Sequence, residues 1–130
     1  MKRHCTFLVA LALVSSAAWA QGKNPVTSVV REILPRQQKN LVAAAEEMPA
    51  DKYSYRPTPG QMTFAHLIIH ITESNNYLCA KISEVPAPKP EELKETDSKD
   101  KLVPALKASF DYCDPIYASM TDAAAAAPVR

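Results

Sequence analysis

Thr-Phe-Ala-His-Leu-Ile-Ile-His-Ile-Thr-Glu-Ser-Asn-Asn-Tyr, residues 63–77, contains two of the three histidines of this 130-residue chain. Thr63 can serve as the N-cap of a helix that runs to about Ser83. Because an α-helix has 3.6 residues per turn, His66 and His70 lie on one face and Glu73 continues the same stripe. The apolar residues around the two histidines predict a central helix with neighbours on more than one side.

The histidine pair has two interpretations. Two neutral imidazoles one turn apart can share a divalent metal ion such as Ni, Zn or Fe, with His70 and His66 as ligands and Glu73 as a third ligand or a catalytic base. Alternatively, each histidine packs in the core and donates an N–H to a backbone carbonyl. The sequence leaves both interpretations open.

The first 20 residues have the features of a secretory signal peptide. Lys2 and Arg3 form a basic start, residues 7–14 are a short apolar run, and Ala18-Trp19-Ala20 is a small-x-small cleavage site. The apolar run is too short to span a membrane comfortably. We therefore expect cleavage after Ala20, a mature domain of residues 21–130 without a membrane anchor, and a periplasmic or secreted location.

The charge balance excludes some classes of partner. Loss of Lys2 and Arg3 with the signal peptide would change the formal net charge from +1 to −1. A nearly neutral domain gives no reason to expect nucleic acid or an anionic membrane as a partner.

Two cysteines, Cys79 and Cys113, would remain in the mature domain. In an oxidising compartment they can form a disulfide between two helices, and two buried free thiols are the alternative. The spacing does not favour a third hypothesis, thiol redox catalysis, because the cysteines lack the close C-x-x-C arrangement that lowers a thiol pKa.

The rest of the chain indicates an all-α fold. Apolar residues at three- and four-residue steps predict one helix from Pro25 to Met48, kinked or split at Pro35, and another from about Ser98 to Met120. Residues 51–61 are expected to form a loop whose tyrosines either pack on the helices or line a pocket mouth. The proline-rich segment 85–98 is expected to be a solvated linker.

Three motifs in order carry a resemblance to a known family. They are Glu46-Glu47-Met48-Pro49 at the end of the first helix, Tyr55-Arg56-Pro57-Thr58-Pro59-Gly60 in the loop, and Phe64-x-x-Leu67-x-x-His70-Ile71. Together they resemble the DinB-like superfamily of metalloenzymes, which includes bacillithiol-transferase-type proteins. The resemblance covers roughly Val26 to Met120.

The resemblance implies an up-down four-helix bundle that holds a divalent metal, commonly Ni, Zn or Fe, with three histidines. One of these ligands comes from the second helix, at the position of His70, and two come from a pair on the fourth helix. It also implies a small thiol as substrate, transferred onto an acceptor.

The sequence printed here has three long helical segments, and the fourth helix with its histidine pair would begin near Arg130. We expect either a shortened reading frame, a degenerate relative, or a site rebuilt from His66, His70 and Glu73. Three helices of a four-helix bundle would leave an apolar face exposed, which predicts a homodimer or misfolding.

Two functional hypotheses follow. In the first, the exported domain is a metal-dependent transferase or hydrolase, in which the ion activates a thiol or water for attack. In the second, it is a non-catalytic helical module that acts through protein–protein contact.

Overall fold

A computed structural model describes residues 23–83, 85–89 and 92–128, so the predicted signal peptide lies outside the described part of the chain. The fold is an all-α bundle, as predicted. Its elements are helix α2 (Pro25–Glu47), a short 3-10 helix η2 (Ala50–Lys52), and helices α3 (Phe64–Ile82), α4 (Lys99–Ser119) and α5 (Asp122–Ala125).

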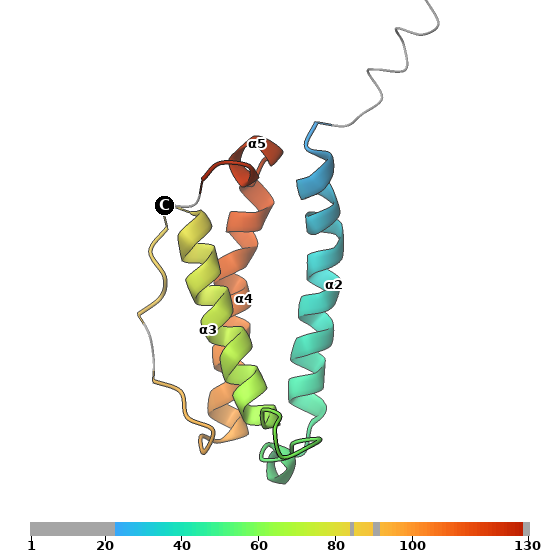
Figure 1. The fold of residues 1–130 in the computed structure, drawn as a ribbon, viewed down its shortest axis with the longest axis vertical. Helices are drawn as coiled ribbons and strands as arrows, with labels where there is room; N and C mark the ends of the chain where they lie inside the picture. Colours follow the sequence, from blue (N-terminus) through green and yellow to red (C-terminus); the bar gives the residue numbers. More distant parts are fainter. Residues whose placement is uncertain (1–22, 84, 90–91, 129–130) are drawn as a thin grey trace, which may run out of the picture.

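The three long helices lie side by side (Figure 1). α2 runs antiparallel to α3, whereas α4 runs in the same direction as α3. A connection that returns along α3 to the start of α4 makes this arrangement possible, and long crossovers of this kind occur in helical bundles. α4 is the central helix, because both α3 and α2 pack against it. This differs from the expectation that the histidine helix, α3, would be central.

α2 is one continuous helix, so of the two expected effects of Pro35, a kink or a split, the split does not occur. Pro35 is exposed, and Arg31, whose carbonyl group loses its hydrogen-bond donor, is only partly buried, so water can reach this group. Pro25 occupies the first turn, where a missing N–H costs nothing, and Asn24 precedes it with a φ of 65°. α4 likewise contains Pro104 and Pro115 without ending.

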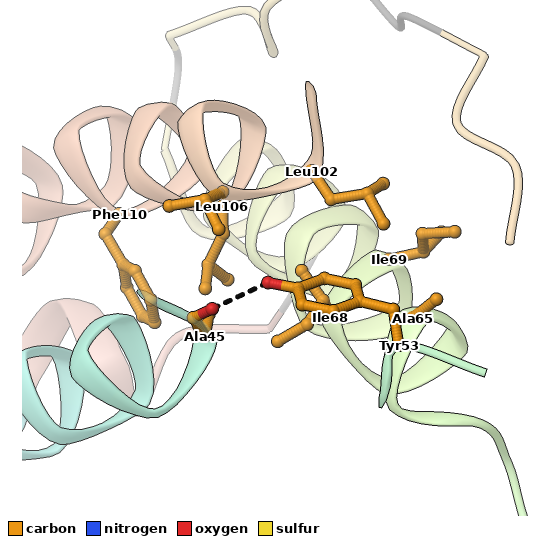
Figure 2. Packing of buried hydrophobic residues seen from close by; sticks show 9 residues of the cluster. Ala45, Tyr53, Ala65, Ile68, Ile69, Leu102, Leu106 and Phe110 are labelled. Carbon is orange, nitrogen blue, oxygen red and sulfur yellow. Dashed lines mark hydrogen bonds between the residues drawn. The ribbon is translucent and has the colours of Figure 1, made fainter. Parts of the chain in front are cut away.

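The main core lies where the C-terminal end of α2, the first half of α3 and the first half of α4 meet (Figure 2). Leu102 and Leu106 of α4 are fully buried there. Tyr53 of the loop is 5% exposed, and its hydroxyl donates a hydrogen bond to the carbonyl oxygen of Ala45 at 2.6 Å. Tyr53 therefore has a packing role, and its burial raises the pKa of its hydroxyl.

The N-terminal half of α2 is much less covered than its periodic pattern predicts. Four apolar residues of the stripe are exposed by 36% to 64% of their surface: Val26, Val29, Val30 and Ile33. This end of α2 is held mainly by polar contacts with α5, where the Asp122 carboxylate accepts hydrogen bonds from the backbone N–H groups of Val26 and Thr27 and from the Thr27 hydroxyl. The bundle thus has an exposed apolar surface on α2.

Among the helices described, none combines the length and the apolar character needed to cross a membrane.

Candidate functional site

The start of α3 is fixed by its cap and by the preceding loop. The Thr63 hydroxyl oxygen accepts a hydrogen bond from the backbone N–H of His66 at 3.0 Å, which confirms Thr63 as the N-cap. Two further N–H groups of this turn, those of Phe64 and Ala65, donate to carbonyl oxygens of the loop at 2.9 Å. Hydrogen bonds to the Thr63 side chain and to the loop therefore fix the backbone of the first turn, which carries His66.

His66 belongs to a cluster that the sequence did not predict. Its Nδ1 atom lies 2.9 Å from Glu95 Oε1, and the Thr63 hydroxyl donates to Glu95 Oε2 at 2.5 Å. Glu95 comes from the crossover between α3 and α4, and both side chains of the His66–Glu95 pair are 45% exposed. The cluster joins α3 to the crossover.

The pKa of Glu95 lies below its usual range. The main cause is the hydrogen bond from Thr63, followed by the hydrogen bond and charge of His66, and Arg56 adds a favourable charge. The carboxylate therefore stays ionised at neutral pH and can accept a hydrogen bond from Nδ1 of His66 when this nitrogen carries a proton. When Nδ1 carries that proton, the Nε2 atom of a neutral imidazole is free to act as a metal ligand or a base.

His70 and Glu73 lie further along α3, and both side chains are exposed. Neither histidine is packed in the core, so the core interpretation of the pair is wrong. Tyr77, on the same stripe, is 63% exposed and has the ammonium group of Lys81 5.6 Å from its ring centroid. The stripe from His66 to Tyr77 therefore faces solvent.

The site residues do not form a complete metal cage. Within residues 23–83, 85–89 and 92–128, no three His, Cys, Asp or Glu side chains are grouped so that they could hold a metal ion together. Two imidazoles one turn apart fit a divalent ion as a pair of nitrogen donors, and His66 has the oriented ring that metal-binding histidines usually have. The fit is therefore limited to two donors, and Glu73 as a ligand or base stays a prediction.

Cys79 and Cys113 are joined by a disulfide, with their Cα atoms 5.6 Å apart. Both residues are almost fully buried, with exposures of 0% and 1%. The bond ties the second half of α3 to α4 within a small apolar cluster that includes Ile116. Its position favours a structural role for the cysteines over redox catalysis.

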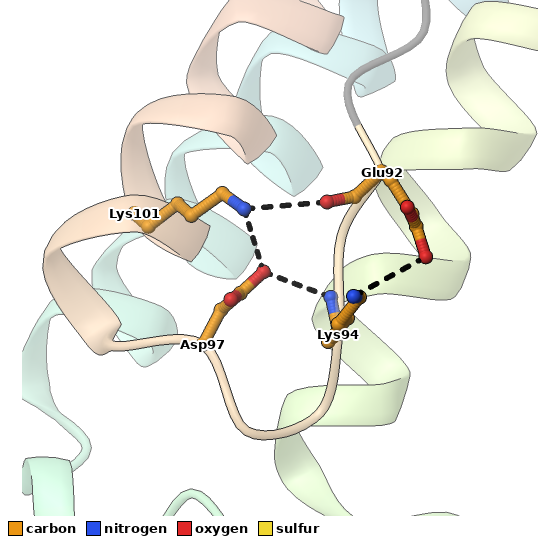
Figure 3. Close-up of polar contacts among 4 residues, drawn as sticks. All are labelled: Glu92, Lys94, Asp97 and Lys101. Carbon is orange, nitrogen blue, oxygen red and sulfur yellow. Dashed lines mark hydrogen bonds and ion pairs between the residues drawn. The ribbon is translucent and has the colours of Figure 1, made fainter.

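The residue of the candidate site that sequence reasoning missed is Glu95. The segment 85–98 has no helical period and many charges, so its residues were expected to be solvated. Most of them are exposed, but Glu95 is held by α3, and the Asp97 carboxylate is held by the backbone N–H of Lys94 and the side chain of Lys101 at 2.8 Å each (Figure 3). A single acidic residue in an irregular segment gives no pattern from which such a contact could be predicted.

Comparison with known proteins identifies the family. A family model described as the DinB superfamily matches residues 33–130, which is more than half of the chain. Searches of curated proteins and of solved structures found no match. The matched range includes α3, α4 and the histidine stripe, and the chain belongs to the DinB superfamily.

Proposed function

We propose that this DinB-superfamily protein is exported and binds a divalent metal ion, Ni, Zn or Fe, through the Nε2 atom of His66 and the ring of His70. The observation that carries the proposal is the 2.9 Å contact between His66 Nδ1 and Glu95, because it fixes the ring and leaves Nε2 available one turn from His70. The exposure of both histidines gives a solvated ion access to them.

The chain's own residues have separate roles in this proposal. Glu95 orients His66 and keeps its Nδ1 protonated, and Thr63 holds Glu95 in place. A bound divalent ion would supply Lewis acidity, which favours the anionic form of a thiol or of water. Glu73, exposed on the next turn of the stripe, would accept the released proton in this proposal. The proposed substrate is a small thiol that enters from solvent.

Two protein donors leave most coordination positions to water or substrate, so we expect weak and exchangeable binding. The test is equilibrium dialysis of the purified protein against Ni, Zn or Fe(II) at concentrations from micromolar to millimolar, followed by metal analysis. Wild type should approach one ion per chain as the metal concentration rises. His70→Ala and His66→Ala should lose it, and Glu95→Gln should weaken binding by about tenfold, as typical for an orienting partner.

The matched control is Glu92→Gln, which alters an exposed glutamate of the same segment that does not contact His66. Equal metal content in wild type and both histidine variants would contradict the metal proposal. With metal bound, transfer of a monothiol to an electrophile should be lost in Glu73→Gln without loss of the ion. A variant that keeps full activity would remove Glu73 from the mechanism.

Export is a separate part of the proposal. The support is the pattern of residues 1–20 together with the buried disulfide, a bond that forms and persists mainly in oxidising compartments. Expression of the full chain in a bacterium, fractionation and intact-mass analysis should give a periplasmic or secreted protein that begins at Gln21. An uncleaved chain in the cytoplasmic fraction would contradict it.

The alternative function is a non-catalytic module that acts through protein–protein contact. The observation that favours it is the exposed apolar surface of α2, with Leu67, Leu78 and Ile82 also exposed on α3. A homodimer is one form of such contact. A protein that forms a stable complex without metal, and that has no metal-dependent activity, would favour the module over the enzyme.

A further inference from the structure

A second feature of the structure, separate from the histidine pair, is a cavity of about 470 Å³. It lies between one face of α3, the first half of α4 and the crossover that runs back along α3. Its size is within the range of pockets that hold small organic molecules. The cavity needs no metal ion, and the only residue that it shares with the metal proposal is Glu73, which lines it.

The walls of the cavity are mainly apolar. Ala105 and Ala108 of α4 form one side, and Ala87, Pro88 and Leu93 of the crossover form the other. The small alanine side chains leave space between the helix and the crossover. An aliphatic or aromatic side group would fill this space and bury apolar surface.

One polar group in the wall lacks a partner. Asn76 lines the cavity, and its Oδ1 atom is buried without a hydrogen bond to any described residue. The neighbouring Asn75 is different, because its amide donates to the Ser109 hydroxyl at 3.0 Å. A buried amide oxygen without a partner is unfavourable. A rotation of the Asn76 side chain toward the cavity would expose this oxygen to a ligand N–H, and the new hydrogen bond would remove the penalty.

Charges of opposite sign flank the same cavity. Glu73 and Lys89 both line it, both are exposed, and neither makes an ion pair with another described residue. A carboxylate favours a ligand ammonium group, and an ammonium group favours a ligand carboxylate. A ligand with both charges satisfies both residues, whereas a singly charged ligand meets one attraction and one repulsion.

The wall formed by Leu93 is held in place at the end of the crossover. The Lys101 side chain of α4 donates to the Glu92 carbonyl oxygen at 3.2 Å and contacts the Asp97 carboxylate, and Asp97 also accepts from the backbone of Lys94 (Figure 3). Glu95, also in the crossover, contacts His66 of α3. The crossover is therefore attached to both helices close to the point where it closes the cavity.

We propose that this cavity binds a small zwitterion with an apolar side group, of the class of apolar amino acids and dipeptides. The ligand ammonium group lies near Glu73 and its carboxylate near Lys89. Its side group packs against Ala105, Ala108 and Leu93. A backbone N–H, which a dipeptide has and a free amino acid lacks, donates to Asn76 and makes the dipeptide the better ligand.

The test is an NMR titration of the ¹⁵N-labelled protein with leucyl-leucine in the presence of EDTA, which keeps it independent of the metal proposal. Saturable shifts should appear at residues of the cavity. The N-acetylated and C-amidated dipeptides, each with one charge removed, should bind about tenfold more weakly. Absence of saturable shifts, or equal binding of the three compounds, would overturn the proposal.

Four variants locate the site. Ala108→Phe fills the cavity and should abolish binding, and Asn76→Leu should weaken it while leaving the fold intact, since it removes an amide without a partner. Glu73→Gln should remove the preference for a free amine, and Lys89→Met the preference for a free carboxylate. Glu47→Gln and Lys39→Met are exposed controls outside the cavity and should bind as wild type does.

Asn76→Leu keeps the test decisive if Ala108→Phe fails to fold. Wild-type affinity in folded Asn76→Leu together with unchanged charge preferences in Glu73→Gln and Lys89→Met would overturn the assignment to this cavity. Dipeptide binding that is absent in EDTA and restored by zinc would place the ligand at the histidines. This result would also overturn the assignment to the cavity.

Discussion

The α3–α4 pair and helix α2 are both built from amphipathic sequence, but they are held in different ways. α3 and α4 share most of the buried apolar residues and a disulfide. α2 has 23 residues, of which only Thr27 and Ala45 are buried. The comparison shows that an apolar period predicts a helix and its inner face, whereas burial depends on which other helices cover that face.

The largest expected effect concerns the disulfide, which exists only in the α3–α4 pair. The cysteines are 34 residues apart, so their bond should stabilise the fold by about 3 to 4 kcal/mol in the chain-entropy view. The double variant Cys79→Ala/Cys113→Ala should lose this amount in urea unfolding. As a control, a reducing agent should destabilise wild type and leave the double variant unchanged. Equal stability of the two proteins would show that the pair is held by packing alone.

A matched pair of apolar truncations tests the comparison next. Leu106 of α4 is fully buried, and Leu106→Ala should cost about 3 kcal/mol of unfolding free energy through lost burial and a cavity. Ile33 of α2 is 43% exposed, and Ile33→Ala should change it by less than about 0.5 kcal/mol, because alanine is also the better helix former. A loss at Ile33 as large as that at Leu106 would mean that the face of α2 is covered in solution.

The attachment of the C-terminal end of α2 should depend on its hydrogen bond with the following loop. Tyr53→Phe removes the hydroxyl that donates to the Ala45 carbonyl oxygen, and should cost about 1 to 2 kcal/mol because a buried acceptor loses its partner. Thermal and urea unfolding measure the loss. Tyr55→Phe alters a tyrosine that is 56% exposed and should have no effect. If the two variants were equally stable, the Tyr53 hydrogen bond would not contribute to the attachment of α2.

Removal of the contact at the N-terminal end of α2 should have the smallest effect on stability, and this effect should depend on pH. Burial acts to raise the pKa of Asp122, but hydrogen bonds from Thr27 and Val26 and the charge of Arg31 outweigh it, so the pKa lies below its usual value. A lowered folded-state pKa stabilises the protein above the unfolded-state pKa of about 4, and this contribution disappears as the pH falls through the folded-state value.

Asp122→Asn should therefore reduce stability at pH 7 and change it little at pH 2. Unfolding curves for wild type and variant at the two pH values measure this difference. Asp111→Asn is the control, since that exposed carboxylate has no hydrogen bond or ion pair to another described residue. A stability difference that is the same at both pH values would exclude the charge of Asp122 as the cause.

The sequence predicted the fold well where one local pattern was sufficient. Thr63 as N-cap, the all-α class and the bounds of the three long helices followed from capping chemistry and periodicity. The sequence did not decide between a kink and a split at Pro35, because tolerance of a proline depends on whether water reaches the freed carbonyl group.

The candidate site was predicted less completely. The spacing of His66 and His70 placed them on one helix face, but their exposure depends on which side of α3 is covered by α4 and the crossover. Glu95 lies 29 residues from His66, and a contact between an irregular segment and a helix has no sequence period. The unpartnered amide of Asn76 follows from packing and also has no sequence signal.

The most direct test of the metal proposal is to observe the histidine ring nitrogens by ¹⁵N NMR during a zinc titration. The chain contains three histidines, and His66 and His70 are the two in the described residues. Zinc should shift Nε2 of His66 and one ring nitrogen of His70 together, while Nδ1 of His66 keeps its proton toward Glu95. Ring nitrogens of both histidines that stay unchanged at millimolar zinc would contradict the proposal.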